Sequence, residues 1–138
     1  EKCGFVMRAF ADGKEASTQI GTAPISRHYN QLGRTSELVV SGKNVRTLTT
    51  FLVRRQGEKP VKITEETVSN GVNGCQLTPG EAEGYVIETG SRKIGLVFLH
   101  QEVGNQSDYN GIRGIYGLGR TMACDLERDT ECMKVLQW

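Results

Sequence analysis

The stretch YVIETGSRKIGLVFLHQEV, residues 85 to 103, decides the fold class. Two β-prone apolar segments flank the polar turn TGSRK, which is the spacing of a β-hairpin with a short loop. Its second half contains IGLVFLH, residues 94 to 100, the most apolar run of the chain. We therefore expect an antiparallel strand pair here, with the second strand crossing the core of the domain.

Short strands separated by turns are also predicted on both sides of this hairpin. They are expected in residues 3–11, which an Asp-Gly turn follows, on either side of SGKN at 41–44, and in residues 61–68. Residues 69–84 are predicted as a long loop, and residues 126–138 as a short helix or a last strand. Seven or eight short strands predict an all-β fold, a single antiparallel β-sandwich domain over residues 1–138 with at most one or two short helices.

The strand after SGKN has apolar and β-branched residues on both of its faces. Phe51 and Val53 share one face with the residues at 45, 47 and 49, whereas Leu48 and Leu52 occupy the other. This pattern is typical of a strand that is covered on both sides.

Charge and hydropathy exclude several classes of partner. The chain has 138 residues, enough for one domain, and its 17 basic and 16 acidic residues leave a net charge of +1. Interspersed charges of this kind argue against binding to duplex nucleic acid or to an anionic membrane. No apolar run approaches the roughly 20 residues that span a bilayer, so we expect no membrane insertion. We expect a monomer.

Cysteine usage indicates the compartment. The four cysteines, Cys3, Cys75, Cys124 and Cys132, form no CxxC pair, and the chain has only two histidines, so no zinc site, other metal site or cofactor is expected. An even count in a small chain favours two disulfides and secretion, with three connectivities open; buried free thiols are the alternative. A helix from Cys124 to Cys132 would hold them about 12 Å apart, too far for a bond. The acceptor pattern NQS at 105–107 is compatible with secretion.

The stretch GIRGIYGLGR, residues 111 to 120, is the strongest candidate binding loop. Glycines near Arg113 and Arg120 could cradle an anion, but the lysine and hydroxyl of a Walker loop are absent, and no βαβ unit surrounds the stretch. We interpret the glycines as bends and bulges. Arg113, close to Tyr109 and Tyr116, is then an exposed contact residue. The predicted binding residues are Tyr109, Arg113, Tyr116 and Arg120.

Two other functions use the remaining residues. His28 and His100 are the only histidines, so a small secreted ribonuclease would use both for acid-base cleavage of RNA. Ordinary surface or half-buried histidines are the simpler interpretation. A carbohydrate-binding sandwich, with Trp138 and the tyrosines stacking on sugar rings, is the third possibility.

In its layout the chain resembles the ToxA-like group of small secreted effectors from plant-infecting fungi. The resemblance rests on the early cysteine in EKC, the late one in TEC, and the turn-and-strand rhythm of NGCQLTPGEAEGYVIETGSRKIGLVF, residues 73–98. It implies a β-sandwich whose ends are joined by a disulfide, here Cys3 to Cys132, leaving Cys75 with Cys124. It also implies a secreted virulence effector, with or without entry into host cells, that binds a host protein without catalysis. The Arg-Gly-Asp loop of the host-toxin member is absent here.

Overall fold

The computed structural model describes residues 4–28, 31–55, 57, 59–100, 109–128 and 132–137. All regular structure in these ranges is β, in thirteen strands, so the expected all-β class is confirmed. None of the described segments is a helix long and apolar enough to cross a membrane.

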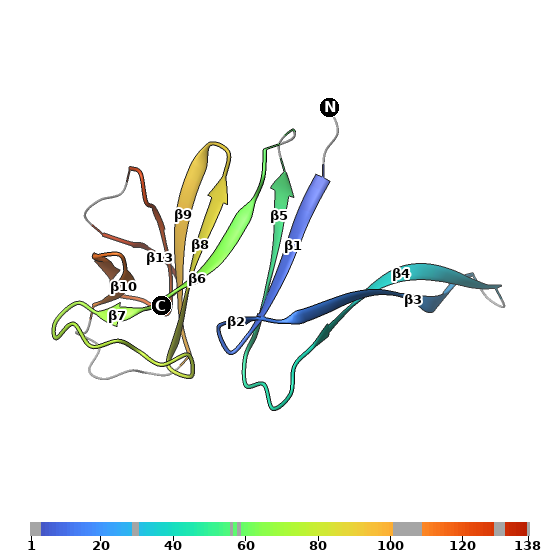
Figure 1. The fold of residues 1–138 in the computed structure, drawn as a ribbon, viewed down its shortest axis with the longest axis horizontal. Helices are drawn as coiled ribbons and strands as arrows, with labels where there is room; N and C mark the ends of the chain where they lie inside the picture. The colour runs from blue at the N-terminus through green and yellow to red at the C-terminus, as the bar shows by residue number, and fades with distance from the viewer. Residues whose placement is uncertain are drawn as a thin grey trace.

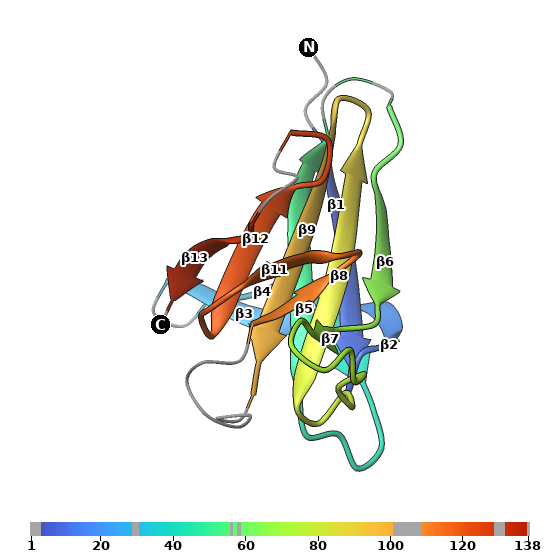
Figure 2. The same cartoon turned by 90° about the vertical axis from the view of Figure 1, so that its left-hand side faces the viewer.

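The strands form four antiparallel sheets (Figures 1 and 2). The middle sheet, in spatial order, contains β13 (Lys134–Gln137), β12 (Thr121–Asp125), β9 (Arg92–Leu99), β8 (Ala82–Thr89) and β6 (Lys62–Glu66). A second sheet contains β2 (Lys14–Glu15), β1 (Gly4–Ala11) and β5 (Leu48–Arg55). The third contains β11 (Ile115–Gly117), β10 (Asn110–Ile112) and β7 (Ser69–Asn70). The fourth is the pair β3 (Ser17–His28) and β4 (Gln31–Ser41).

The middle sheet is covered on both faces. Side chains alternate along β8, so Val86 points to one face and Tyr85 to the other. Val86 belongs to a hydrophobic cluster that includes Ile112 of β10, and Tyr85 belongs to a second cluster with Phe10 and Phe51 of the β1–β5 pair. Three layers result, with the β7–β10–β11 sheet on one side of the middle sheet and the β1–β5 pair on the other (Figure 2).

The aromatic cluster joins the β1–β5 pair to the middle sheet. The ring of Tyr85 lies 4.8 Å from the rings of both Phe10 and Phe51, and Phe98 of β9 stands 6.2 Å from Tyr85. Rings at these separations and tilted angles attract one another in addition to the area that they bury. Most of the domain's bulkiest buried side chains therefore lie where two layers meet.

The hairpin of β3 and β4 has no layer beneath it. It leaves the body after β2, projects away from the β1–β5 pair, and returns to β5 (Figure 1). Ten consecutive residue pairs, from Ser17 opposite Ser41 to Ser26 opposite Leu32, hold its strands together. At about 3.4 Å per pair this ribbon is about 30 Å long.

The sequence-based expectations hold best for local pairs. The described part of the 85–103 stretch forms the β8–β9 hairpin up to Leu99, and strands β1 and β6 lie where strands were predicted. The end of the chain is a strand, β13, and not a helix. The strand count of seven or eight was too low, and four sheets replace the two of a simple sandwich, because the β3–β4 hairpin and the short strands near residues 70 and 110–117 were not predicted.

Candidate functional site

The β3–β4 hairpin exposes large apolar side chains on both faces, and the two most exposed of them share one face. Because cross-strand partners share a face, the even-numbered residues of both strands lie together. This face carries Ile20 and Leu32, exposed to 83% and 85%, together with Leu38, which is also exposed. We call it the knob face, because these side chains protrude from the hairpin into solvent. Ile20 and Leu38 lie opposite each other, and Leu32 lies opposite Ser26 nearer the tip of the hairpin.

The opposite face of the hairpin is smoother. Ile25 lies beside Gly33 on the facing strand, 3.7 Å from where a β-carbon would stand, and Glu37 lies across Gly21 in the same way. Long side chains therefore fill the space left by cross-strand glycines on this face. The knob face lacks such glycines, and its side chains face other side chains across the strand pair.

The root of the hairpin is held to the body by Asp12 in the β1–β2 turn. The Asp12 carboxylate accepts hydrogen bonds from the backbone amides of Thr47 and Arg46, at 2.9 and 3.0 Å. The Thr47 amide in particular lowers the pKa of this exposed carboxyl from its usual value. These bonds fix the chain at the point where it returns from β4 to β5.

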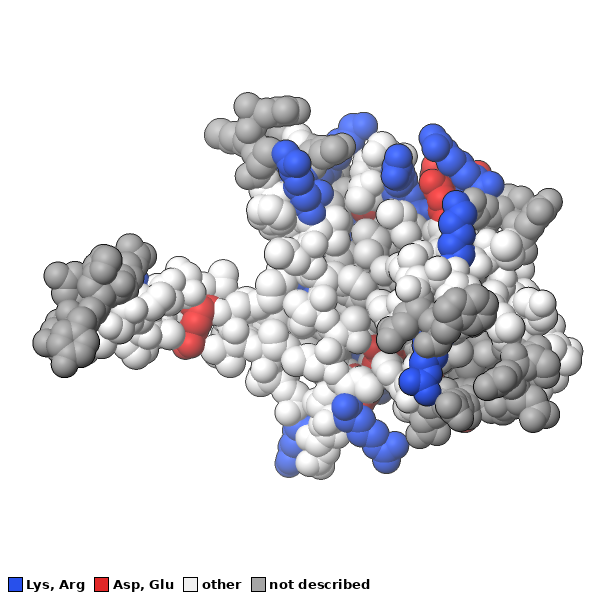
Figure 3. All heavy atoms as spheres, turned by 180° about the vertical axis from the view of Figure 1, so that it is seen from behind, with Lys and Arg blue, Asp and Glu red and all other residues white. Residues whose placement is uncertain are grey.

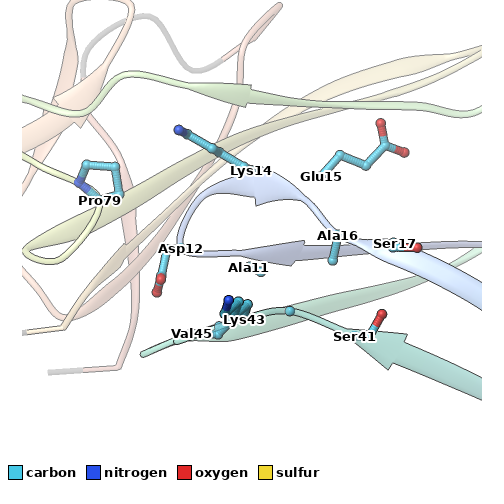
Figure 4. Close-up of a pocket in the computed structure, with 11 residues that line it drawn as sticks. Ala11, Asp12, Lys14, Glu15, Ala16, Ser17, Ser41, Lys43, Val45 and Pro79 are labelled. Atoms are coloured by element: carbon cyan, nitrogen blue, oxygen red, sulfur yellow. The ribbon is translucent and has the colours of Figure 1, made fainter.

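A pocket of about 480 Å³ lies beside this root (Figure 4). Its wall contains both cationic and anionic side chains, including Lys14, Glu15 and Lys43, together with the strand ends Ser17 and Ser41. Within the described residues no group of three or more histidine, cysteine or acidic side chains could hold a metal. The pocket lies where the chain enters β3 and where it returns from β4 to the body.

The outer face of the β1–β5 pair is a second exposed apolar surface. Phe10 and Phe51 point inward to the middle sheet, so the alternate residues point outward. Phe5, Leu48 and Leu52 are on this outer face, and Phe5 and Leu52 are exposed to 66% and 65%. The prediction that Leu48 and Leu52 would be covered is wrong for the single chain, in which both are exposed, although Ala9 on the same face is buried.

The predicted binding loop is mainly a structural hairpin. Arg113 and Gly114 both have positive φ, 52° and 80°, which is the backbone of a two-residue type I′ turn between β10 and β11. The Arg113 guanidinium donates to the Glu66 carboxylate at 2.8 and 3.1 Å, and this contact raises the pKa of Arg113. Both side chains are partly exposed, so the pair adds little stability.

The four predicted binding residues lie in separate surroundings. Tyr116 packs on the backbone of Gly71, where a β-carbon would stand 2.9 Å from its ring. Arg120 is exposed at the start of β12, and its carbonyl accepts the amide of Leu99. Tyr109, next to β10, is 52% exposed. Tyr109, Arg113 and Arg120 have exposed side chains, whereas Tyr116 is half-buried against Gly71.

We expect Tyr116→Ala to destabilise the domain. Removing a half-buried aromatic ring from its contact with Gly71 should cost about 2 kcal/mol, which lowers Tm by roughly 8 °C in a domain of this size. Tyr109→Ala, the matched exposed variant, should leave Tm unchanged. Thermal unfolding followed by circular dichroism distinguishes the two, and equal effects would mean that Tyr116 does not support the loop.

The two histidines are not brought together. His28 is the last residue of β3, at the far end of the projecting hairpin, whereas His100 follows β9 in the body (Figure 1). The backbone positions alone separate them by the length of the hairpin. No two-histidine site of the ribonuclease type forms in this structure.

His100 instead belongs to a buried polar cluster around Glu83, which we call the Glu83 cluster. The Glu83 side chain has no exposed surface, and its oxygens accept hydrogen bonds from the hydroxyls of Thr47, Thr49 (2.7 Å) and Tyr85 (2.9 Å). The Nε2 atom of His100 lies 3.5 Å from Glu83 Oε1. Burial, and then the bond to Glu83, raises the pKa of the Tyr85 phenol. The cluster links β5 and β8 to His100, which directly follows β9.

Sequence reasoning missed this cluster because it placed residues 69–84 in a loop. The observed β8 begins at Ala82, so Glu83 enters the sheet. The available signal was that Glu83 lies two residues before the predicted hairpin stretch. Extending its first strand by three residues, from Tyr85 back to Ala82, would have placed Glu83 in the sheet.

The predicted disulfide between Cys75 and Cys124 is absent. Cys124 lies in the hydrophobic cluster of the middle sheet beside Gly95, whereas Cys75 is an exposed thiol in the loop after β7. No bond joins any two of Cys75, Cys124 and Cys132. Cys3, the predicted partner of Cys132, lies outside the described residues, as do the NQS pattern and Trp138.

Comparisons with protein-family models, with curated proteins and with solved structures found no match to this chain. The resemblance to ToxA-like effectors therefore stays a prediction. The candidate site rests on the geometry of the chain itself, in which the knob face and the outer face of β1–β5 are the two extended apolar surfaces that we identify.

Proposed function

We propose that the protein is a protein-binding module that works without catalysis and engages its partner through the β3–β4 hairpin. The observation that carries this proposal is the knob face, where Ile20 and Leu32 stand almost fully exposed on a projecting ribbon. Residues that bind other proteins are commonly held out from a rigid scaffold in this way.

The energetics of the hairpin support the proposal. A two-stranded ribbon alone in water is marginally stable, because it buries apolar surface on neither face. The hairpin has Pro24 and Gly21 within β3 and few cross-strand apolar pairs, so its own interactions are weak. A partner lying on the knob face would supply the missing layer.

The expected host-protein partner fits this kind of surface. A mostly uncharged, apolar ribbon suits a protein surface better than a nucleic acid or an anionic membrane. In Figure 3 the projecting hairpin shows few charged side chains, whereas Lys and Arg side chains stand around the edges of the body. Secretion and a host target remain predictions of the resemblance.

Site-specific photo-crosslinking tests the proposal. Purified protein with p-benzoylphenylalanine in place of Leu32 on the knob face is irradiated in an extract of the cells or tissue where it acts. We expect one discrete adduct, because the substituted side chain lies in the contact. The same probe in place of Val72, an equally exposed residue on a loop of the body, should give none.

A second substitution makes this measurement specific. The adduct from position 32 should be lost when Ile20→Glu is added to the same chain, because a charge on the knob face weakens the contact. Equal labelling from positions 32 and 72, or no adduct from position 32, would count against the hairpin as the binding element.

A further inference from the structure

The outer face of the β1–β5 pair lacks the cover that its sequence pattern predicts. Leu48 and Leu52 give β5 the composition of a strand buried on both sides, yet the single chain leaves this face open. Phe5 of β1 adds a third large side chain to the same surface, and Met7 lies directly opposite Leu52. The body thus has an apolar sheet face of the kind that another β-layer covers.

We infer that the partner of the hairpin is a second copy of this chain, and that each hairpin lays its knob face across the outer β1–β5 face of the other copy. The inference rests on the proposed function, since it names the partner of the same hairpin. It replaces the expectation of a monomer, which did not take the hairpin into account.

The two surfaces match in size. The hairpin is a ribbon about 30 Å long and about 10 Å wide, and the eight residue pairs of β1 and β5 present a face about 25 Å long. One such contact covers about 250 Å² on each partner, so two reciprocal contacts bury about 1,000 Å², the smallest area expected of a specific interface. A single contact would fall short, which favours reciprocal exchange.

The two surfaces also match in charge. Along the described residues the knob face has one charged side chain, Arg34 in its outer half, and the outer β1–β5 face has one, Arg54 near the end of β5. Neither face has an acidic side chain. Both centres therefore consist of apolar and hydroxyl side chains, as the cores of protein interfaces do.

The placement of the hairpin allows both contacts to form at once. The views in Figures 1 and 2 agree that the hairpin leaves the body on the side to which the outer β1–β5 face is turned. The hairpin and the outer β1–β5 face therefore border the same open space beside the body. A two-fold axis places the hairpin of each copy in this space of the other copy, so every residue contact occurs twice.

Sedimentation of the full chain tests this inference without any variant. We expect a species of twice the 15.2 kDa chain mass at micromolar concentration. Ile20→Glu with Leu32→Glu, on the knob face, should raise the dissociation constant by about 100-fold or more, and Leu52→Glu on the sheet face should weaken the dimer as well. The control, Gln19→Glu with Thr35→Glu, adds the same charge to the opposite face of the hairpin and should leave the dimer intact.

Two outcomes would overturn the second-copy assignment: a wild-type chain that stays monomeric at 100 micromolar, or a dimer that none of these variants weakens. The photo-crosslink separates this failure from that of the proposed function. An adduct at position 32 of twice the chain mass supports the exchange. A discrete adduct of another mass keeps the hairpin as a binding element but removes the second copy, and the absence of an adduct removes both.

Discussion

Glu83→Ala is expected to lower the free energy of unfolding by about 3 kcal/mol, a large part of the stability of a domain of this size. The substitution removes the acceptor of three hydroxyl donors, the buried one of Tyr85 and the partly buried ones of Thr47 and Thr49. The hydroxyl of Thr47 also donates to Asp12, so those of Thr49 and Tyr85 lose their acceptor, and leaving a buried group unpaired costs about 1–3 kcal/mol. The expected loss of unfolding free energy is smaller than the sum of these penalties, because the protein partly relaxes and water enters the site.

Urea unfolding of two further variants checks this prediction. Tyr85→Phe removes one donor and keeps the carboxylate, so it should cost only about 1 kcal/mol. Glu83→Gln keeps the size of the side chain but replaces one accepting oxygen with an NH₂ group, which cannot accept the hydroxyl donors. Its loss of unfolding free energy should lie between those of Glu83→Ala and Tyr85→Phe. If Glu83→Ala were no more harmful than Tyr85→Phe, the carboxylate would not organise the cluster.

The Glu83 cluster bears on function because it fixes the surface that we assign to binding. Thr47 follows the returning strand of the hairpin and precedes β5, and its backbone amide also binds Asp12 at the hairpin root. Replacing Glu83 should therefore loosen both the hairpin root and the outer β1–β5 face. A Glu83 variant is not a clean probe of binding, whereas the exposed Ile20, Leu32 and Leu52 are.

Local pairs were predictable from the sequence because their signals lie within a few residues. The β8–β9 hairpin has two apolar segments and a short polar turn, and β1 ends at an Asp-Gly turn. The register of these pairs follows from alternation alone. No distant contact was needed to place them.

The hairpin of β3 and β4 was not predictable in the same way. Its first strand includes Gly21 and Pro24 and buries no face, so apolar alternation, the usual signal of a strand, is weak. The SELVV segment, residues 36–40, was predicted as a strand without a named partner. It pairs with residues 18–22, which the sequence did not indicate as a strand.

The candidate binding residues show a second limit. Composition cannot distinguish an exposed tyrosine from one packed on a glycine far along the chain, as Tyr116 is on Gly71. The glycines of GIRGIYGLGR were interpreted correctly as backbone features, since type I′ turns demand positive φ at two successive positions. Which of them the fold requires depends on cross-strand distances that only the structure supplies.

Gly111→Ala is expected to be the most damaging of the glycine substitutions in that stretch, with a loss of about 4 kcal/mol or more. A β-carbon at this position would stand 1.9 Å from the carbonyl oxygen of Ile115 and 2.8 Å from the Cα of Tyr116, and both are backbone atoms of the paired strand. No rotamer change relieves such an overlap. Strands β10 and β11 would have to separate, and Ile112, which is fully buried, would leave its cluster.

Two matched substitutions show whether close approach is the cause. Gly114 has positive φ but no atom within 4 Å of its β-carbon position, so Gly114→Ala should cost only the backbone strain, about 1 kcal/mol. Gly33, in the hairpin, has ordinary φ and ordinary contacts, so Gly33→Ala should be neutral. Urea unfolding should rank the losses Gly111, Gly114, Gly33. A mild Gly111→Ala would mean that β10 and β11 do not pair in this register, and the glycines would again need a ligand to explain them.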